Sequence, residues 1–291
     1  MSLVKRHPLI TFFVLVYALA WIIESPLVLL KDTITASQGQ IFYILSANVV
    51  SVVAIVLTGM VFGRKALRKL LGRLLIWRVN PIWYLVVLLG PVALAGGAVG
   101  LNALMGGPAP SLGNTLLGVV IMWAIFIFPG SALGEEIGWR GYALPRLQTG
   151  RSALSASLIL APIWALWHLP LWLTGAPART PLLYAAFVVS AFALSVVTTW
   201  VYNSTGGSIL MVVLLHASAN LPITLTIDSL GNRAVVPVML YWGLLVVAAI
   251  VVVIVAGPKH LSRKHRKQEQ EEEGAAESGI ATPGVVKPTP A

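Results

Sequence analysis

The sequence contains no cysteine, which excludes disulfide bonds, thiolate metal ligands and catalysis by a cysteine nucleophile. Charge is also scarce, since only 10% of the residues are Asp, Glu, Lys or Arg while 57% are hydrophobic. With a mean hydropathy of +0.86, this composition argues against a soluble protein with unusually apolar core helices. It indicates an integral membrane protein.

Long apolar runs recur along the chain, and about 20 apolar residues are enough for a helix to cross the hydrocarbon layer. Because lipid offers no partners to backbone polar groups, such runs form helices rather than open strands. We therefore predict an all-α, polytopic membrane protein, in which the fourth span extends past its apolar run. The eight predicted transmembrane helices are Leu9–Leu30, Ile41–Phe62, Ile82–Leu104, Thr115–Leu133, Ala153–Leu173, Leu182–Tyr202, Ser208–Ile227 and Val235–Ala256.

The net charge of +10 follows the topology of these spans and does not indicate a nucleic-acid partner. Seventeen of the 20 basic residues fall in the two termini and in the connections after the second, fourth and sixth spans, all of which lie on one side of the membrane. The other three, Lys31, Arg179 and Arg233, lie on the opposite side. Because basic residues stay on the cytoplasmic side, both termini are expected there. The excess also attracts anionic lipid headgroups, so the expected surroundings are a lipid bilayer, the plasma membrane of a prokaryote.

Three segments qualify this domain organisation. The N-terminus has basic residues and an Ala18-Leu19-Ala20 stretch, as signal peptides do, but the apolar run continues, so we interpret it as an uncleaved first span. Over residues 64–78, the basic side chains fall on one face of a helix and the leucines on the other. This pattern predicts a helix that lies in the cytoplasmic interface of the membrane. Residues 259–291 lack the apolar content to fold and are predicted to form a disordered cytoplasmic tail, leaving a transmembrane domain over residues 1–258.

Few ionisable side chains lie within or beside the apolar runs, and each is a functional candidate by default. Of ten acidic residues, only Glu24, Glu135 and Glu136 do so, and of five histidines only His168 and His216. The two adjacent carboxylates are the most informative feature among them.

The first motif contains both glutamates, in the stretch from Gly134 to Gly141. Helix neighbours point about 100° apart, so Glu135 and Glu136 face different surroundings. Glu136 has the spacing for an ion pair with Arg140, whereas Glu135 lacks such a partner and remains available for proton transfer. Glycines at spacings of four and three predict the close approach of another helix or a substrate.

Two further motifs lie on later spans. Trp164 precedes His168 by one helical turn and can pack on its ring, with Pro162 and Pro170 on either side. His216 and Asn220 share one helix face, where an amide could stabilise an oxyanion. Each residue alone also fits a structural role as an interhelical hydrogen-bond partner. A shared water-filled pocket explains the whole set more economically.

Together these motifs resemble the CAAX prenyl endopeptidase and bacteriocin-processing (CPBP, or Abi) family of intramembrane proteases, over a motif core of residues 115–225. The family pattern is Glu-Glu-x-x-x-Arg, then an aromatic residue four before a histidine, then His-x-x-x-Asn. Here the three are Glu135-Glu136-x-x-x-Arg140, Trp164-x-x-x-His168 and His216-x-x-x-Asn220. The one departure is Trp164, where the family usually has phenylalanine.

The resemblance implies a role for each motif residue in the hydrolysis of a peptide bond in a membrane-embedded or lipidated substrate. Glu135 would activate a water molecule, His168 would position that water or the leaving group, and His216 with Asn220 would stabilise the oxyanion. Glu136, Arg140 and Trp164 would support the site. Some members of the family are labelled metalloproteases, so His168, His216 and either glutamate are the alternative ligands of Zn²⁺. We favour a mechanism without a metal cofactor, because Zn²⁺ would consume the base and no HExxH motif is present.

Two other functions fit a membrane protein with buried ionisable groups. One is a proton-coupled transporter, disfavoured because the chain shows no internal repeat, and the other is a non-catalytic immunity or scaffold protein. Convergence of the motif residues also requires an adjustment, since helical rise places them at different depths. We expect Glu135 to lie deeper than the apolar boundary indicates, and the fifth span to start late or break at Pro162.

Overall fold

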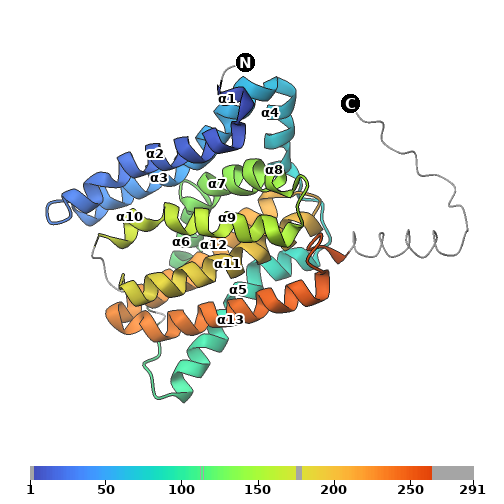
Figure 1. The fold of residues 1–291 in the computed structure, drawn as a ribbon. Coiled ribbons are helices and arrows are strands. Elements are labelled where there is room, and N and C mark those ends of the chain that lie inside the picture. The colour runs from blue at the N-terminus through green and yellow to red at the C-terminus, as the bar shows by residue number, and fades with distance from the viewer. Residues whose placement is uncertain (1–2, 112, 114, 175–178, 264–291) are drawn as a thin grey trace, which may run out of the picture.

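The computed structural model describes residues 3–111, 113, 115–174 and 179–263, and this part of the chain is all helical, without a strand (Figure 1). The predicted all-α class is therefore confirmed. The described elements follow one another as α1 (Leu3–Arg6), α2 (Pro8–Leu29), α3 (Ala36–Leu57), η1 (Thr58–Phe62), α4 (Gly63–Gly72), η2 (Arg73–Leu75), α5 (Ile82–Leu104), α6 (Leu116–Ile127), α7 (Ser131–Glu136), η3 (Ile137–Ala143), α8 (Leu144–Gln148), α9 (Ala153–Trp167), α10 (Leu169–Trp172), α11 (Pro181–Ser204), α12 (Ile209–Leu230), η4 (Gly231–Ala234) and α13 (Val235–Ala256).

Six helical stretches of the described chain are long and apolar enough to cross a membrane. One of them, Ile209–Ala256, contains both α12 and α13, joined by the short turn η4. A further apolar helix, Ala153–Trp167, is shorter at 15 residues. The multi-pass architecture follows from these stretches, while the predicted count of eight spans stays a prediction.

The helices pack so that the segment from α7 to η3 lies inside the molecule. Helix α3 runs beside α2 on one side and contacts α7 and η3 on the other. Helix α12 contacts α5, α6 and α7, and α11 lies between α9 and α13 (Figure 1). Every residue of η3 is buried as a result. The glutamate motif is therefore enclosed by other helices.

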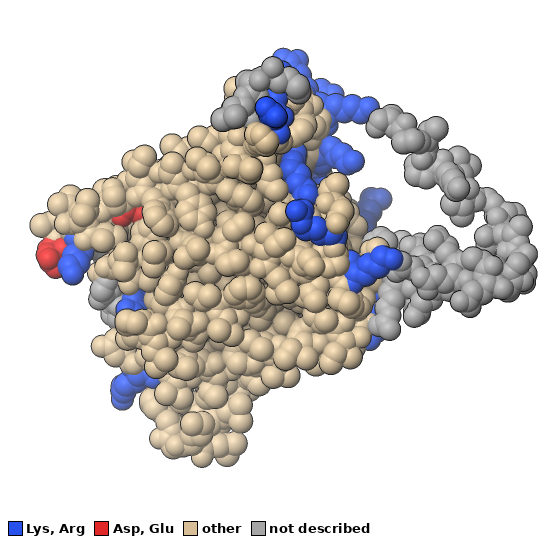
Figure 2. Space-filling model, viewed as in Figure 1, with Lys and Arg blue, Asp and Glu red and all other residues tan. Residues whose placement is uncertain are grey.

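Figure 2 shows a face with few charged side chains away from its ends, and many large apolar side chains of the described helices are exposed. Ile10 and Ile22 on α2 are 62% and 68% exposed, and Ile254 on α13 is 70% exposed. Such a surface is stable in contact with acyl chains and would be unfavourable in water. Together with the long apolar helices, it supports an integral membrane protein.

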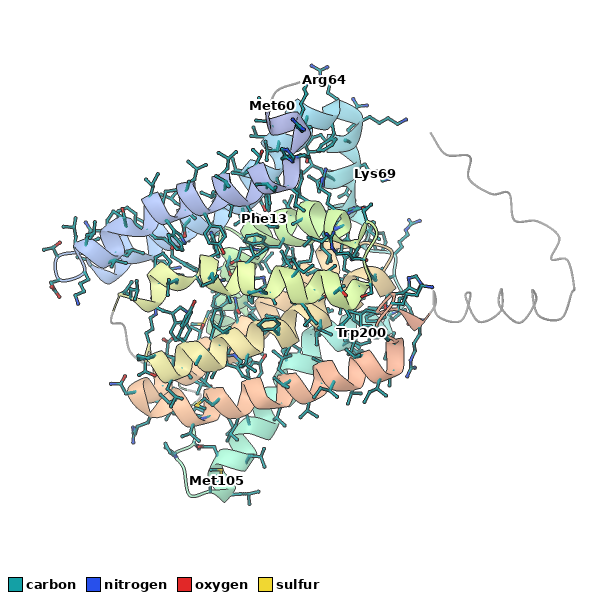
Figure 3. All side chains as sticks on the ribbon, viewed as in Figure 1. Phe13, Met60, Arg64, Lys69, Met105 and Trp200 are labelled. Carbon is teal, nitrogen blue, oxygen red and sulfur yellow. The ribbon has the colours of Figure 1, made fainter. Side chains whose placement is uncertain are left out.

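The amphipathic helix expected over residues 64–78 is present but shorter. Helix α4 ends at Gly72, and one turn of 3₁₀-helix continues to Leu75. Arg64 and Lys69 point outward, as Figure 3 shows, whereas Leu70 is buried against the body. Arg73 departs from the predicted basic face, because its guanidinium turns inward to the Tyr202 hydroxyl and the Gly141 carbonyl.

Basic side chains gather at the end of the molecule where the N-terminus and α4 lie (Figure 2). Arg140 is an exception to the predicted segregation, since it is only 1% exposed and paired with Glu136. The sequence analysis counted Arg140 among the basic residues of a cytoplasmic connection. Because Arg140 forms an ion pair inside the fold, it gives no information on which side of the membrane that connection lies. The orientation of this end towards the cytoplasm stays a prediction.

The packed chain extends past the predicted start of the tail at residue 259. The carbonyls of Pro258 and Lys259 accept the backbone N–H groups of Leu154 and Ala153, at 3.0 and 2.8 Å. Leu261 is fully buried. These contacts join the chain after α13 to the first turn of α9. The remaining residues of the predicted tail, 264–291, lie outside the described residues.

Candidate active site

The glutamate motif lies in the middle of a long interrupted helical stretch, Leu116–Gln148. Helix α6 ends at Ile127, a cis Phe128–Pro129 peptide bond follows, and α7 starts at Ser131. From Ile137 the backbone continues as the π-helix η3, which the sequence did not predict. The expected extension of the fourth span past Leu133 is confirmed, since the helical stretch continues to Gln148 and contains Glu135, whose depth in the bilayer stays a prediction.

Three glycines of this motif permit the close packing that their spacing predicted. A Cβ atom on Gly138 would lie 2.5 Å from Val50 Cγ1 and 2.6 Å from the Val50 carbonyl oxygen on α3. A Cβ on Gly134 would lie 3.1 Å from Ala47 backbone atoms, and one on Gly141 would lie 2.7 Å from Leu70. The neighbour is another helix of the fold at all three positions, rather than a substrate.

Glu136 forms the centre of a buried ionic cluster. Its Oε1 accepts hydrogen bonds from Arg140 Nη1 at 2.8 Å and contacts His216 Nδ1 at 2.7 Å, while Arg140 Nη2 donates to Thr198 Oγ1 at 2.9 Å. These side chains are at most 2% exposed. The predicted Glu136–Arg140 pair is confirmed. A buried charge needs such partners, so the cluster fixes Glu136 and orients the His216 ring.

Glu135 has different surroundings, although it is equally buried at 0% exposed. Its Oε2 accepts a hydrogen bond of 2.7 Å from the indole N–H of Trp164. Its Oε1 has no hydrogen-bond partner among the described residues. Buried polar atoms are rarely left unpaired, so this oxygen has the free acceptor capacity that a general base requires.

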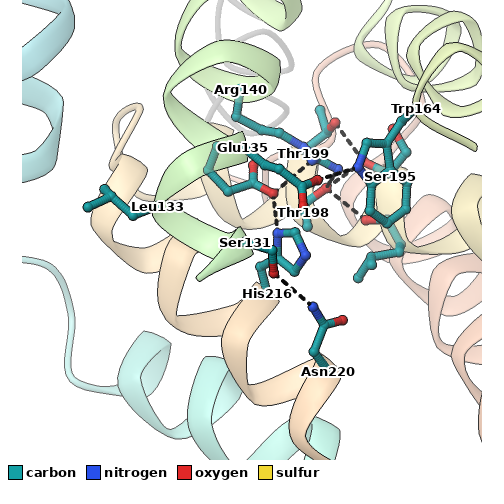
Figure 4. Close-up of polar contacts among 12 residues, drawn as sticks. Ser131, Leu133, Glu135, Arg140, Trp164, Ser195, Thr198, Thr199, His216 and Asn220 are labelled. Atoms are coloured by element: carbon teal, nitrogen blue, oxygen red, sulfur yellow. Dashed lines mark hydrogen bonds and ion pairs between the residues drawn. The ribbon is translucent and has the colours of Figure 1, made fainter. Parts of the chain in front are cut away.

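Trp164 contacts the side chains of all three motifs. Its ring packs edge-on against the His168 ring, with centroids 4.9 Å apart, and against the His216 ring at 6.0 Å. The guanidinium of Arg140 lies 5.7 Å from the same ring. The predicted packing of Trp164 on His168 is confirmed. Figure 4 shows Trp164 with Glu135, Arg140 and His216 in one polar cluster.

His168 follows the last residue of α9 and is half-buried. Its Nδ1 lies 2.9 Å from the Trp164 carbonyl oxygen, which can only accept, so this nitrogen carries the proton. Trp167 and Phe187 pack edge-on against the ring at 4.7 and 5.2 Å. When this ring is neutral, Nε2 is its remaining acceptor.

The expectation that the fifth span starts late or breaks at Pro162 is wrong. Helix α9 begins at Ala153 and continues through Pro162 to Trp167. It ends earlier than the predicted Leu173, so that His168 lies at its C-terminal end. The motifs meet because the stretch containing Glu135 is buried within the bundle, and α9 needs no break to bring Trp164 to it.

Asn220 lies one turn beyond His216 on α12, as the spacing predicted. Its Nδ2 is 3.4 Å from Ser131 Oγ on α7, a long hydrogen bond that a better acceptor could replace (Figure 4). Trp123 donates to the Ser218 hydroxyl at 3.0 Å, and Tyr241 to the Ala219 carbonyl at 3.2 Å. These partners on α6 and α13 fix this part of α12, and no spacing in the sequence could indicate them.

The donor set does not fit a metal site as it stands. Among the described residues, no three His, Asp or Glu side chains form a group that could hold a metal ion. Glu136 Oε1 already interacts with Arg140 and His216, and Glu135 Oε2 accepts the Trp164 indole N–H. A catalytic Zn²⁺ commonly takes three protein ligands, so ligation by these residues would require rearrangement.

Comparison with known proteins gives two similarities, of which the family match covers this cluster. Residues 116–222 match the family described as type II CAAX prenyl endopeptidase Rce1-like. A protein of Methanococcus maripaludis, CAAX prenyl protease 2, is 29% identical over 103 residues. That alignment covers 33% of this chain and 38% of the archaeal protein, so it spans well under two thirds of the relative.

Proposed function

We propose, because residues 116–222 match the Rce1-like family of CAAX prenyl endopeptidases, that this chain is an intramembrane endopeptidase. The resemblance carried by the three sequence motifs is thereby confirmed for this segment. The observation that supports the activity best is Glu135. It is a fully buried carboxylate with one oxygen held by Trp164 and the other without a partner among the described residues.

In the proposed reaction, Glu135 Oε1 accepts a proton from water while the water oxygen attacks the peptide carbonyl. His168 Nε2 accepts a hydrogen bond from the other O–H of the same water, because His168 Nδ1 already donates its proton to the Trp164 carbonyl. His216 and the Asn220 amide stabilise the oxyanion, with the Asn220 Nδ2 leaving its long contact to Ser131. Glu136 and Arg140 keep the His216 ring in place.

The proposed substrate is a membrane-embedded or lipidated protein or peptide, such as one that ends in a prenylated CAAX sequence. The site is enclosed by helices of an apolar bundle, so a segment already anchored in the bilayer can reach it without leaving the membrane. The family match and the name of the archaeal relative point to the same class of substrate. We also propose that the site contains the water-filled pocket that the sequence led us to expect.

The test is Glu135→Gln in proteoliposomes, with a fluorogenic peptide carrying a prenylated C-terminal cysteine motif. Glutamine keeps the size and can still accept from Trp164 but is a far weaker base, so we expect kcat to fall by about a hundredfold or more. The matched control is Asp228→Asn, since Asp228 is an exposed carboxylate on α12. Full cleavage by folded Glu135→Gln would exclude Glu135 as the base, and solute uptake that depends on Glu135 would favour a transporter.

We also propose that the reaction proceeds without Zn²⁺, because no three His, Asp or Glu side chains of the described residues are grouped as ligands and one oxygen of each glutamate already has a protein partner. Treatment with ortho-phenanthroline is expected to leave the cleavage rate equal to that measured with its non-chelating meta isomer. Selective inhibition by the chelating isomer, reversed by added Zn²⁺, would contradict the proposal.

A further inference from the structure

A third carboxylate, Glu24, is buried beside the site but lies outside the segment that matches the family. It is 0% exposed on α2, and its Oε1 accepts a hydrogen bond of 2.6 Å from Ser46 Oγ on α3. Its Oε2 has no hydrogen-bond partner in the described part of the chain. Glu24 thus resembles the two glutamates of the site, since Glu24, Glu135 and Glu136 each have one buried oxygen without a donor among the described residues.

Helix α2 is attached to the part of α9 that presents Trp164 and His168. The Tyr17 hydroxyl donates to the Ile163 carbonyl, and the Trp21 indole donates to the Trp167 carbonyl at 3.1 Å. Glu24 follows Trp21 by three residues, so it lies on the same face of α2, one turn further along. Helix α2 also contacts α10, which begins directly after His168.

The charges around Glu24 place it in the same polar region as Glu135. The two carboxylates are close enough to repel each other, while the Arg179 guanidinium attracts Glu24. Tyr43 on α3 also interacts electrostatically with Glu24, Glu135 and Arg179. Glu24 thus interacts with the polar region that contains Glu135.

A buried carboxylate oxygen without a donor is unfavourable, and a ligand with N–H groups or positive charge would relieve it. Resting on the proposed function, we propose that Glu24 is a further catalytic residue, whose Oε2 binds the leaving amine of the cleaved peptide. Two carboxylates near one nitrogen favour the positive charge that develops on it.

As the scissile C–N bond breaks, the water proton taken by Glu135 passes to the peptide nitrogen, and the electron pair of that bond stays on the nitrogen. The new amine takes the proton of the new carboxylic acid, so the products are a carboxylate and an ammonium ion. Glu24 Oε2 accepts an N–H of this ammonium and neither gives nor takes a proton in the step.

The experiment compares two substrates of identical sequence in proteoliposomes, one with the scissile amide and one with an ester in its place. The ester releases a neutral alcohol, which gains nothing from the Glu24 charge. Glu24→Gln is expected to lower kcat on the amide by about tenfold or more while leaving kcat on the ester nearly unchanged. Glu135→Gln is expected to lose both activities, because both reactions need the activated water.

The ester rate also reports how much folded enzyme each preparation contains. Asp32→Asn, which removes an exposed carboxylate after α2, serves as the control and is expected to keep both rates. If Glu24→Gln does not fold, Glu24→Asp keeps the charge but shortens the side chain and should give a smaller, still amide-selective loss. An unchanged ratio of amide to ester rates would overturn the role of Glu24, and a wild-type chain that cleaves neither substrate would overturn the proposed function instead.

Discussion

At the scale of single residues, the adjacent glutamates show how one bond along the chain separates two chemical environments. Glu136 faces the Arg140 guanidinium and the His216 imidazole, and Glu135 faces the neutral indole of Trp164. The angle of about 100° between helix neighbours predicted this division. The indole donor was not predicted, because Trp164 was assigned only the packing of the His168 ring.

The Trp164 indole is also where this chain departs from the phenylalanine usual in the family. Trp164→Phe keeps an aromatic ring beside His168 but removes the N–H that bonds Glu135 Oε2. A hydrogen bond to a charged group contributes about 1.5–3 kcal/mol, so we expect kcat to fall by about tenfold or more with little change in KM. Peptide cleavage by the purified variant measures this.

Trp139→Phe provides the matched control for that substitution. Trp139 is as buried as Trp164, but its indole N–H has no hydrogen-bond partner among the described residues. Its ring packs against Phe12 and Trp167, which a phenylalanine can largely continue to do. We expect cleavage close to wild type. Equal losses in both variants would show that ring size matters at Trp164 and the N–H does not.

At the scale of elements, the packing of η3 on α3 decides where the glutamates lie. Gly138 has no room for a side chain, because a Cβ would meet the Val50 carbonyl at 2.6 Å, and a backbone atom cannot rotate away. Gly138→Ala should separate η3 from α3, at a cost of about 1–3 kcal/mol typical of overpacking, and should reduce cleavage. Thermal unfolding in detergent and the cleavage rate measure the two effects.

Gly100→Ala is the control at this scale, because Gly100 lies within α5 and a Cβ there would meet nothing within 4 Å. Alanine is the better helix former by about 1 kcal/mol, so the melting temperature should stay the same or rise. If Gly138→Ala had the same melting temperature as the wild type, α3 would move away from η3 at little cost and would not constrain the site.

The same elements show which features the sequence could predict. Contacts within one helix follow from spacing, so the Glu136–Arg140 pair and the Trp164–His168 packing were accessible, as were the close approaches at the glycines. Contacts between helices depend on packing that spacing does not encode, which is why Thr198 and Ser131 were missed. The π-helix after Glu136 and the unbroken course of α9 through Pro162 were missed for a related reason, since tertiary packing overrides local preference.

At the scale of the whole molecule, the distribution of charge separates two ends of an apolar body. Basic side chains gather around the N-terminus and α4, and the chain after α13 returns to the same end (Figures 1 and 2). The turn between α2 and α3 lies at the other end (Figure 1). Because basic residues remain on the cytoplasmic side, we predict that the α4 end faces the cytoplasm and that both termini lie there.

The lack of native cysteine makes this orientation directly measurable, since a single introduced thiol is the only target of a maleimide. Lys69→Cys on α4 and Asp32→Cys between α2 and α3 place that thiol at exposed positions of opposite ends. In intact cells, a membrane-impermeant maleimide should label Asp32→Cys and spare Lys69→Cys. In inverted vesicles the pattern should be reversed. Labelling of Lys69→Cys from outside would place α4 on the far side of the membrane, and substrates held in the cytoplasmic leaflet would then approach the site from the other end.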